Sequence, residues 1–578
     1  MKFQGIAVSP GIAIGKALVV ETTETTIFRI PISEKEVAHE KERFKNAIAQ
    51  SKKQLQSVKE KISKEVSQKY SFIFDAHLLI LEDESLIGEV LSIIGKERVN
   101  AEWALKIVVG KLLKAFENIS DPYFRERGGD IEDIYRRVQA ILAGGKNHHR
   151  LSELIDDVIV VAHSLSPADT ALLNTDHVIA FATDLGGRTS HTAILANALE
   201  IPAVVGLLDV YSRVRNRDEI VVDGNNGLFI INPTEKEKEE YLRKKIRYER
   251  KESRLLELRG VPAITRDGTE IKLMANIELP GEIHSAIQHG AHGIGLYRSE
   301  FLYLMKSPDL PTEEDHFRLY REIAEKVYPD EALVRTLDLG GEKYFHAVLE
   351  KDEANPVMGL RAIRLCLKRK DIFRLQLRGI LKASHYGNIK IMFPLISTIE
   401  ELRNARSLLE EIKEELRREG TPFNERMEIG IMIEVPAAAM IADILAREVQ
   451  FISIGTNDLI QYYMAADRSN KSVSYLYQPL HPSILRTLKF VIDGAAKNNV
   501  DVSICGEMAS DPFCLPVLLG LGMRKLSMNP KAIPTIKKLV MKISIREMAG
   551  IMEEAQKLGS AEEIERFLIQ KKIATFRI

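Results

Sequence analysis

The stretch Gly186-Gly187-Arg188-Thr189-Ser190-His191-Thr192 lies between two segments of different periodicity. Residues 178–182 before it form an apolar run typical of a buried strand, and apolar residues after it recur at helical spacing. This order predicts a strand, a glycine turn and a helix, with His191 in the first helical turn. Unpaired N–H groups and the helix dipole favour phosphate there, and Arg188 adds a planar fork of donors. By itself, one histidine among 14 is more often structural than chemical.

The composition limits the class of protein. The chain has 578 residues, 45% of them hydrophobic and 28% charged, and this length predicts about three domains. Its net charge of −1 offers no general attraction to nucleic acid or to a membrane. Three cysteines are too few for a disulfide framework, no apolar run is long enough to span a bilayer, and the N-terminus has no signal pattern. We therefore expect a cytoplasmic enzyme that binds no nucleic acid and does not insert into a membrane.

In the N-terminal half, the sequence pattern changes from strand-like to helical and then to mixed α/β. Residues 1–22 predict short strands that join a sheet elsewhere, and residues 146–233 predict the α/β domain that they complete. Between them, residues 23–145 predict an inserted bundle of four helices. The first has its apolar positions within 44–62, the second lies at 72–81, the third surrounds 103–116, and the fourth is capped by Asp130 and ends at Leu142. Residues 234–260, dense in Lys, Glu and Arg, predict an exposed helical linker. Such a linker implies that the two halves move as separate bodies.

The remaining residues, 261–578, alternate between strand and helix patterns. Eight candidate strands lie at residues 271–277, 293–298, 333–338, 389–394, 430–435, 451–455, 502–505 and 525–528. Eight strands with interleaved helices predict a (β/α)₈ barrel of the TIM type. The predicted fold class is therefore multidomain α/β: a swivelling α/β domain with an inserted helical bundle, followed by this barrel.

Polar residues gather at the carboxyl ends of the predicted barrel strands, the face on which active sites of such barrels form. Glu434 and Asp458 are candidate ligands for Mg²⁺, which prefers oxygen donors. For either carboxylate, an ion pair with a basic neighbour explains the residue equally well. The mixture of arginines and carboxylates indicates an anionic ligand and a metal.

A set of basic and neutral donors near the same strand ends can clamp an anion. Its members are Arg298, Arg335, Arg468, the weaker candidate Arg361, and the neutral donor Asn457. Cys505 ends the seventh predicted strand, and this position favours a role in chemistry, whereas Cys366 and Cys514 are expected to be buried apolar residues.

The string from Gly186 to His191 resembles the phosphohistidine loop of the phosphoenolpyruvate-utilising enzymes. The segments Ile433-Glu434-Val435-Pro436-Ala437-Ala438, Ser453-Ile454-Gly455-Thr456-Asn457-Asp458-Leu459 and Ser503-Ile504-Cys505-Gly506-Glu507-Met508 narrow the resemblance. They are similar to those of the Enzyme I family of the bacterial sugar phosphotransferase system, the phosphoenolpyruvate–protein phosphotransferases. The likeness runs from Gly5 to near the C-terminus.

This resemblance implies a function. The barrel would bind phosphoenolpyruvate with Mg²⁺, and the phosphoryl group would pass to His191 and then to a histidine of the carrier protein HPr. Cys505, working as a thiol, would protonate the enolate to give pyruvate. Thr170 would hydrogen-bond the imidazole of His191, although its own sequence context equally predicts an N-cap. The resemblance also implies a homodimer formed through the barrel.

The resemblance further places His77, Glu84 and Arg127 in the region of the helical bundle that docks HPr. From the residues alone, the acidic turn 82–84 is more typical of a solvated surface. Opposite charge on the carrier would raise the association rate more than the affinity.

Three rival functions explain part of the sequence. A pyruvate phosphate dikinase or phosphoenolpyruvate synthase shares the loop and the barrel. It needs an ATP-binding domain, and we expect none, because only 22 residues and the bundle precede the swivelling domain and no Walker-type loop is present. A Mg²⁺-dependent carbon–carbon lyase would use Glu434 and Asp458 but leave His191 idle. A non-catalytic sensor of phosphoenolpyruvate would bind a partner without turnover.

Overall fold

The computed structural model describes residues 1–20, 27–65, 78, 80–117, 122–143, 157–165, 177–187, 193, 196, 201–278, 280–306, 310–339, 355–468, 470, 472–571 and 573. The chain forms two compact units, Met1–Glu252 and Ser253–Ile578. Within the described ranges, no helix combines the length and the apolar character needed to cross a membrane.

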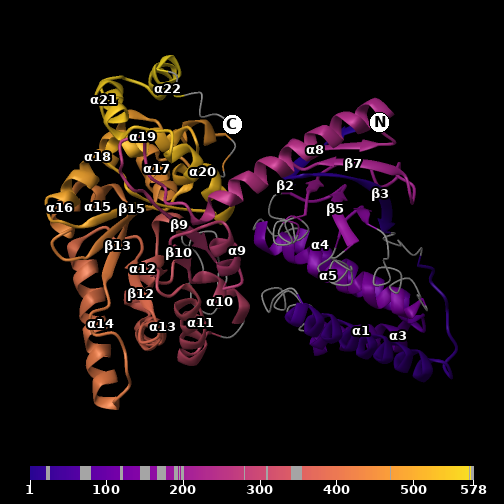
Figure 1. Ribbon diagram of the computed structural model, residues 1–578. Coiled ribbons are helices and arrows are strands. Elements are labelled where there is room, and N and C mark those ends of the chain that lie inside the picture. The colour runs from indigo at the N-terminus through magenta and orange to yellow at the C-terminus, as the bar shows by residue number, and fades with distance from the viewer. Residues whose placement is uncertain are drawn as a thin grey trace. The chain divides into compact units, whose positions relative to one another are not determined.

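One eight-stranded sheet runs through the first unit (Figure 1). Its strands are β1 (Lys2–Gln4), β2 (Ile6–Ser9), β3 (Ile12–Val20), β4 (Val158–Ala162), β5 (Val178–Thr183), β6 (Ala203–Val205), β7 (Glu219–Asp223) and β8 (Leu228–Ile231), in the order β1-β8-β7-β3-β4-β5-β6-β2. Strand β3 pairs in parallel with β4 and antiparallel with β7. The N-terminal strands are therefore completed by strands from far along the chain. The predicted domain limits at residues 22, 145, 233 and 260 remain predictions.

Among the described residues between β3 and β4 lie the helices α1 (Val37–Glu65), α3 (Glu84–Glu97), α4 (Ala101–Glu117) and α5 (Pro122–Leu142). They share one apolar core, in which Phe44, Leu55 and Val108 are at most 1% exposed. The predicted second helix, at residues 72–81, lies almost entirely outside the described residues, and α3 was not predicted. The predicted start of the last helix was wrong. Helix α5 begins at Pro122 rather than after Asp130, because proline needs no hydrogen bond in the first turn of a helix.

The strand before the histidine loop is present as predicted. Strand β5 is buried at nearly every position, and beyond the loop Ala193 and Ala196 are helical and fully buried. The predicted linker is helical too. It forms α8 (Glu235–Leu256), which is followed by the 3₁₀ turn η4 (Glu257–Gly260).

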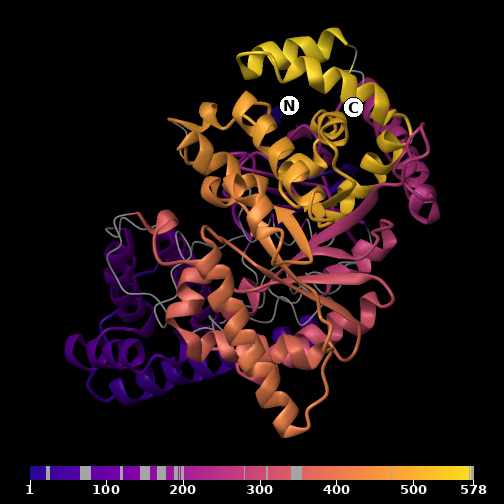
Figure 2. The ribbon, with the colours of Figure 1, turned by 90° about the vertical axis from the view of Figure 1, so that its left-hand side faces the viewer.

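The second unit contains the predicted barrel. Its strands are β9 (Lys272–Ile277), β10 (Ile294–Arg298), β11 (Glu331–Arg335), β12 (Asn388–Phe393), β13 (Ile429–Ile433), β14 (Phe451–Ile454), β15 (Asp501–Ile504) and β16 (Lys525–Met528). They close into a ring of eight parallel neighbours. The strands are apolar runs because both of their faces are buried, and helices surround them (Figures 1 and 2).

Helices and 3₁₀ turns lie between the barrel strands and after the last strand, β16. They are α9 (Glu282–Gln288), α10 (Glu300–Lys306), α11 (Glu313–Val327), η5 (Pro356–Met358), α12 (Ala362–Lys368), α13 (Lys370–Ala383), α14 (Ile399–Glu419), α15 (Pro436–Met440), α16 (Ala442–Leu445), α17 (Thr456–Met464), η6 (Ser474–Leu476), α18 (Pro482–Ala496), η7 (Glu507–Ser510), α19 (Cys514–Leu521), η8 (Pro530–Ala532), α20 (Ile533–Val540), α21 (Ile545–Ala555) and α22 (Ala561–Gln570).

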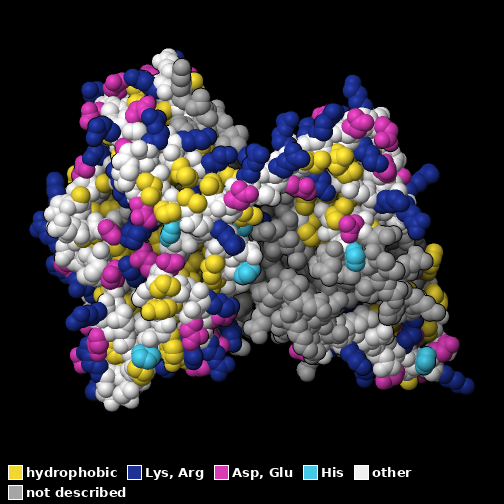
Figure 3. Space-filling view, in the orientation of Figure 1, with side chains coloured by type: hydrophobic (Ala, Val, Ile, Leu, Met, Phe, Trp, Pro, Cys, Tyr) yellow, Lys and Arg dark blue, Asp and Glu magenta, His cyan; other side chains and the backbone are white. Residues whose placement is uncertain are grey.

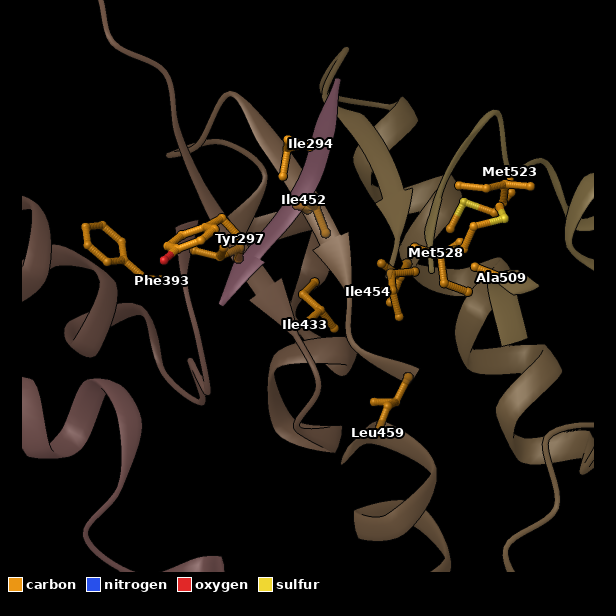
Figure 4. Close-up of a cluster of buried hydrophobic side chains, with 14 of the residues drawn as sticks. Ile294, Tyr297, Phe393, Ile433, Ile452, Ile454, Leu459, Ala509, Met523 and Met528 are labelled. Atoms are coloured by element: carbon orange, nitrogen blue, oxygen red, sulfur yellow. The ribbon is translucent and has the colours of Figure 1, made fainter. Parts of the chain in front are cut away.

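The barrel has two hydrophobic cores. The larger one lies between strands and helices, and Figure 4 shows Tyr297, Ile433 and Ile454 among its members. The smaller one fills the interior of the barrel with Met274, Leu296, Leu333, Met392, Met432, Phe451 and Cys505. The ring of Phe451 explains a glycine in the neighbouring strand, because a Cβ at Gly430 would lie 2.3 Å from it. Cys505 is the member of this core that lies at the carboxyl ends of the strands.

Acidic and basic side chains are interspersed over the outside of the barrel unit (Figure 3). On α11, for example, Arg318 pairs with Glu314 at 2.6 Å and Arg321 pairs with Glu325 at 2.7 Å. Such exposed pairs each contribute about 0–1 kcal/mol. Packing of the two cores therefore stabilises the unit more than these pairs do.

Candidate active site

A cavity of about 240 Å³ lies at the carboxyl ends of the barrel strands. It is lined by Leu296, Arg298, Arg335, Asp338, Val357, Arg361, Met432, Glu434, Gly455, Asn457, Asp458, Gln461, Asp467, Arg468, Cys505 and Gly506. Every barrel residue selected from the sequence as a site residue is in this set. The strand ends bring them together because parallel strands of a closed barrel all end on one face.

Two of the four arginines are held by buried carboxylates. Arg335 donates from Nη2 to Glu300 and from Nη1 to Asp338, both at 2.9 Å. Arg361 donates from Nη2 to Asp338 at 2.8 Å and to Asp458 at 3.2 Å. Burial opposes the charge of both guanidinium groups, but the surrounding carboxylates outweigh it and raise the pKa of each arginine. Both arginines are therefore permanent positive charges with fixed orientations.

Glu434 lies directly after β13 and is 2% exposed. Its Oε1 accepts a hydrogen bond from the backbone N–H of Leu395 at 2.7 Å, and Leu395 takes a left-handed conformation with φ 53°. Burial, together with the charges of Asp458 and Asp338, raises the pKa of Glu434 to about 8. These carboxylates are therefore close enough to repel one another, and a cation between them would remove that repulsion.

The donor set fits Mg²⁺. Oxygen ligands are what this ion prefers, and one or two protein carboxylates usually suffice because substrate oxygens and water complete its octahedron. Glu434 and Asp458 are two such carboxylates in one cavity. Within the described residues, no group of three or more His, Cys, Asp and Glu side chains is placed to hold a metal, so these two would need substrate and water as further ligands. Asp458 also makes the alternative contact considered from sequence, an ion pair with Arg361.

The other two arginines lie at the exposed rim of the cavity. Arg298 pairs through Nη1 with Glu278, the residue that follows β9. Arg468 pairs through Nη1 with Glu507 at 3.2 Å. Asn457, in the first turn of α17, accepts a hydrogen bond from the N–H of Glu507 at 2.9 Å and faces the Glu507 carboxylate through Nδ2 at 3.4 Å.

The thiol of Cys505 lies on the floor of the cavity beside Leu296 and Met432. It is 4% exposed, and its Sγ is 3.6 Å from the carbonyl oxygen of Ile454. Burial raises the pKa of this thiol to about 11, and the charge of Glu434 acts in the same direction. Cys505 is therefore a protonated thiol at neutral pH. Cys366 and Cys514 are buried, as expected from the sequence.

Most of the predicted site residues of the first unit lie outside the residues that the structure describes. His77, Thr170, Arg188 and His191 fall in segments that the described ranges do not include. Glu84 is the first residue of α3, and Arg127 lies within α5. Their roles remain predictions.

Tyr462 does not line the cavity but contacts Arg361, which does, and the sequence analysis did not select it. Its hydroxyl donates to the carbonyl oxygen of Val357 at 2.7 Å and accepts from Nη1 of Arg361 at 3.4 Å. Tyr462 follows Asp458 by four residues in one helix, so the two share a helix face. That spacing is the signal that would have identified it.

Three family profiles match the chain: the N-terminal part of the PEP-utilising enzymes over residues 4–127, their mobile domain over 154–227, and their PEP-binding domain over 252–545. A phosphoenolpyruvate-protein phosphotransferase of Bacillus sp. (strain S) is 44% identical over 98% of this chain and 97% of its own. The chain belongs to the phosphoenolpyruvate-protein phosphotransferase family. The protein of that name from Bacillus subtilis (strain 168) is 43% identical over 98% of this chain and 99% of its own. A solution NMR structure of Enzyme I (nEIt) is 41% identical, with a TM-score of 0.38, and covers 43% of this chain and 99% of that chain.

Proposed function

We propose that the chain transfers the phosphoryl group of phosphoenolpyruvate to His191, releases pyruvate, and then passes the group to a histidine of HPr. This is the first step of the sugar phosphotransferase system. One observation carries the barrel half of the proposal: a single cavity gathers four arginines, two carboxylates suited to Mg²⁺ and a protonated thiol. Phosphoenolpyruvate offers a phosphate and a carboxylate on a three-carbon skeleton, which is the charge and size that such a cavity suits.

The four arginines would bind the substrate from two places, the inside of the cavity and its rim. Arg335 and Arg361 are fixed by carboxylates on one side and line the cavity with their remaining donors. Arg298 and Arg468 approach from the rim, and Asn457 adds a neutral donor for a phosphate oxygen. Guanidinium groups bind phosphate and carboxylate in bidentate fashion, so several of them fix both ends of the substrate.

Glu434 and Asp458 would hold Mg²⁺, which when bound supplies positive charge to the phosphate oxygens. In the transfer step, a ring nitrogen of neutral His191 forms a bond to phosphorus in line with the departing oxygen. The bond from phosphorus to that oxygen breaks, and its electron pair stays on the oxygen as an enolate. Arg298, Arg335 and Arg468 hold the charge that develops.

Cys505 would complete the reaction. The methylene carbon of the enolate takes the proton of the Cys505 thiol, which gives pyruvate and a thiolate. Support comes from the raised pKa of this thiol, because the proton must remain on sulfur until the enolate forms. In the first unit, Arg188 would steady the phosphoryl group on His191, and Thr170 would orient the imidazole.

We further propose that His77, Glu84 and Arg127 contact HPr, that the enzyme is a cytoplasmic homodimer formed through the barrel, and that the linker α8–η4 allows the two units to move independently. The names of the curated relatives favour this function over a pyruvate phosphate dikinase or phosphoenolpyruvate synthase. A dikinase would require ATP for labelling.

The decisive experiment uses ³²P-labelled phosphoenolpyruvate with Mg²⁺. We expect acid-labile, alkali-stable label on the protein that passes to HPr and is absent from His191→Ala. Label that persists in His191→Ala, or that appears only with ATP, would contradict the proposal. Arg369→Ala is the matched control, because this arginine pairs on the outside of the barrel with Asp371 at 2.8 Å, and its labelling is expected to equal that of the wild type.

A further inference from the structure

The four arginines of the cavity are paired in two different environments. The side chains of Arg335 and Arg361 are 11% and 12% exposed, and their partners Glu300 and Asp338 are 3% and 5% exposed. At the rim, Arg298 and Glu278 are 37% and 49% exposed, and Arg468 and Glu507 are 44% and 74% exposed. The inner pairs are therefore part of the core, whereas the outer pairs are in contact with solvent.

This difference determines what each carboxylate can do. Removing a buried partner leaves an uncompensated buried charge, so Glu300 and Asp338 are fixed parts of the site. An exposed ion pair is weak and exchanges readily with solvent and other ions. Glu278 and Glu507 can therefore be replaced by another anion at little cost.

Glu507 contacts two of the groups proposed to bind phosphate. Its Oε1 lies 3.2 Å from Nη1 of Arg468 and 3.4 Å from Nδ2 of Asn457. Its backbone N–H, 2.9 Å from Oδ1 of Asn457, keeps the residue beside that amide. A single carboxylate oxygen thus lies between a guanidinium and an amide donor, as a phosphate oxygen would.

We propose that Glu278 and Glu507 are displaceable carboxylates that occupy the donors of Arg298, Arg468 and Asn457 until the anionic groups of the substrate replace them. This inference rests on the proposed function, because it takes phosphoenolpyruvate as the anion. In the empty enzyme the two glutamates keep the rim arginines oriented toward the cavity. When substrate binds, each ion pair must open first, so each glutamate lowers the affinity of the site.

The proposal makes an unusual prediction, namely that removing a charged residue beside the site tightens binding. Glu507→Gln keeps the size and the backbone contact to Asn457 but abolishes the competing charge. We expect the Kd for phosphoenolpyruvate to fall about two- to fivefold, the range that corresponds to the loss of one exposed ion pair. Glu278→Gln should act similarly, and the two effects should multiply because the residues serve different arginines.

The test is calorimetric titration of phosphoenolpyruvate with Mg²⁺ into His191→Ala, in which the substrate cannot transfer its phosphoryl group, and into the same protein carrying Glu507→Gln or Glu278→Gln. Glu448→Gln is the matched control: Glu448 pairs with Arg403 at 2.7 Å on the outside of the barrel, and its variant should leave the Kd unchanged. The gain should shrink as salt is added, because exposed pairs are screened.

The outcomes separate this inference from the function on which it rests. If His191→Ala itself binds no phosphoenolpyruvate, the proposed function fails. If it binds, but both glutamine variants bind equally or more weakly, the glutamates merely position the arginines and this inference is overturned. Glu507→Asp, which keeps the charge, should not reproduce the tighter binding of Glu507→Gln; equal tightening by both variants would also overturn it.

Discussion

Nη2 of Arg361 donates a hydrogen bond to Oδ2 of Asp458 at 3.2 Å. A residue proposed to bind the substrate therefore neutralises a residue proposed to bind the metal. The same Nη2 contacts Asp338 at 2.8 Å, so one guanidinium compensates two carboxylates on different strand ends. A metal ion would also compensate the negative charge of these carboxylates. Metal binding should therefore affect the stability of the barrel unit.

We predict that Arg361→Met destabilises the metal-free barrel unit and makes it more dependent on Mg²⁺. Asp458 loses its ion pair with Arg361, and Asp338 also loses one but keeps its ion pair with Arg335. Breaking a buried pair typically costs about 3–5 kcal/mol. Thermal unfolding with and without MgCl₂ measures the effect, and the stabilisation by Mg²⁺ should be larger for the variant than for the wild type. Arg364→Met is the control, because Arg364 is a neighbour that pairs with Glu401 instead. An equal Mg²⁺ effect in Arg361→Met and the wild type would argue against a metal at Glu434 and Asp458.

Cys505 should react slowly with iodoacetamide at neutral pH. Its pKa is raised to about 11 by burial, and only the thiolate is nucleophilic. The rate should rise about tenfold per pH unit from pH 7 to pH 10 without levelling off, as followed by mass spectrometry of the peptide that contains Cys505. Cys505→Ala gives the background from the other thiols. A rate that levels off below pH 9 would mean that the thiol has an ordinary pKa. That result would argue against Cys505 as the proton donor.

Gly506→Ala should disrupt the site by steric contact alone. The backbone angle φ of −82° suits alanine, but the new Cβ would lie 1.8 Å from Oγ1 of Thr456 and 3.0 Å from Oδ1 of Asn457. Relieving this contact would displace the start of α17 by about 1 Å, and a displacement of that size should lower kcat/KM about 100-fold. Steady-state kinetics with HPr measure the loss.

Two further variants test the cause of that loss. Adding Thr456→Ala removes the closest clashing atom and should restore part of the activity of Gly506→Ala. Gly550→Ala, in helix α21 with no neighbouring atom within 4 Å of the new Cβ, should leave kcat/KM unchanged. If Thr456→Ala restores nothing, the effect of Gly506→Ala is not steric.

His316 should make the barrel unit sensitive to acid. It is fully buried between Tyr303 and Tyr320, whose hydroxyl groups lie 3.3 Å and 3.2 Å from its ring nitrogens. Burial lowers its pKa from 6.5 to about 3. The unfolded chain therefore takes up a proton below about pH 6.5 while the folded chain does not, so the stabilisation present above pH 6.5 is lost as the pH falls towards 3.

Between pH 7.5 and 4.5, this histidine should remove about 2.7 kcal/mol from the free energy of unfolding, which corresponds to two pKa units. Urea unfolding at the two pH values should show a smaller pH effect for His316→Gln. His385, an exposed histidine of the same unit, gives the control His385→Gln, which should show the same pH effect as the wild type. An unchanged pH effect in His316→Gln would show that the ring titrates normally.

The sequence predicted most of the fold because its signals are local. Each barrel strand is a short, largely apolar run, and all eight strands were located to within about three residues of their true ends. The same regularity identified the cavity residues, since the carboxyl ends of parallel strands converge whatever the packing around them. Helix α3 was missed and the start of α5 was placed too late, although Asp83, which accepts from the N–H of Leu86, and Pro122 mark where these helices begin.

The sequence by itself determined the order of the barrel strands, the barrel, and which side chains face its mouth, because these depend on periodicity and strand direction. Only the tertiary structure decided which charges meet: that Arg361 bridges Asp338 and Asp458, that Glu507 lies between Arg468 and Asn457, and that Lys537 is buried with its Nζ 2.9 Å from the carbonyl oxygen of Arg259. These partners are tens or hundreds of residues apart in the chain. Their pairing depends on how strands and helices pack in three dimensions, and no local pattern encodes it.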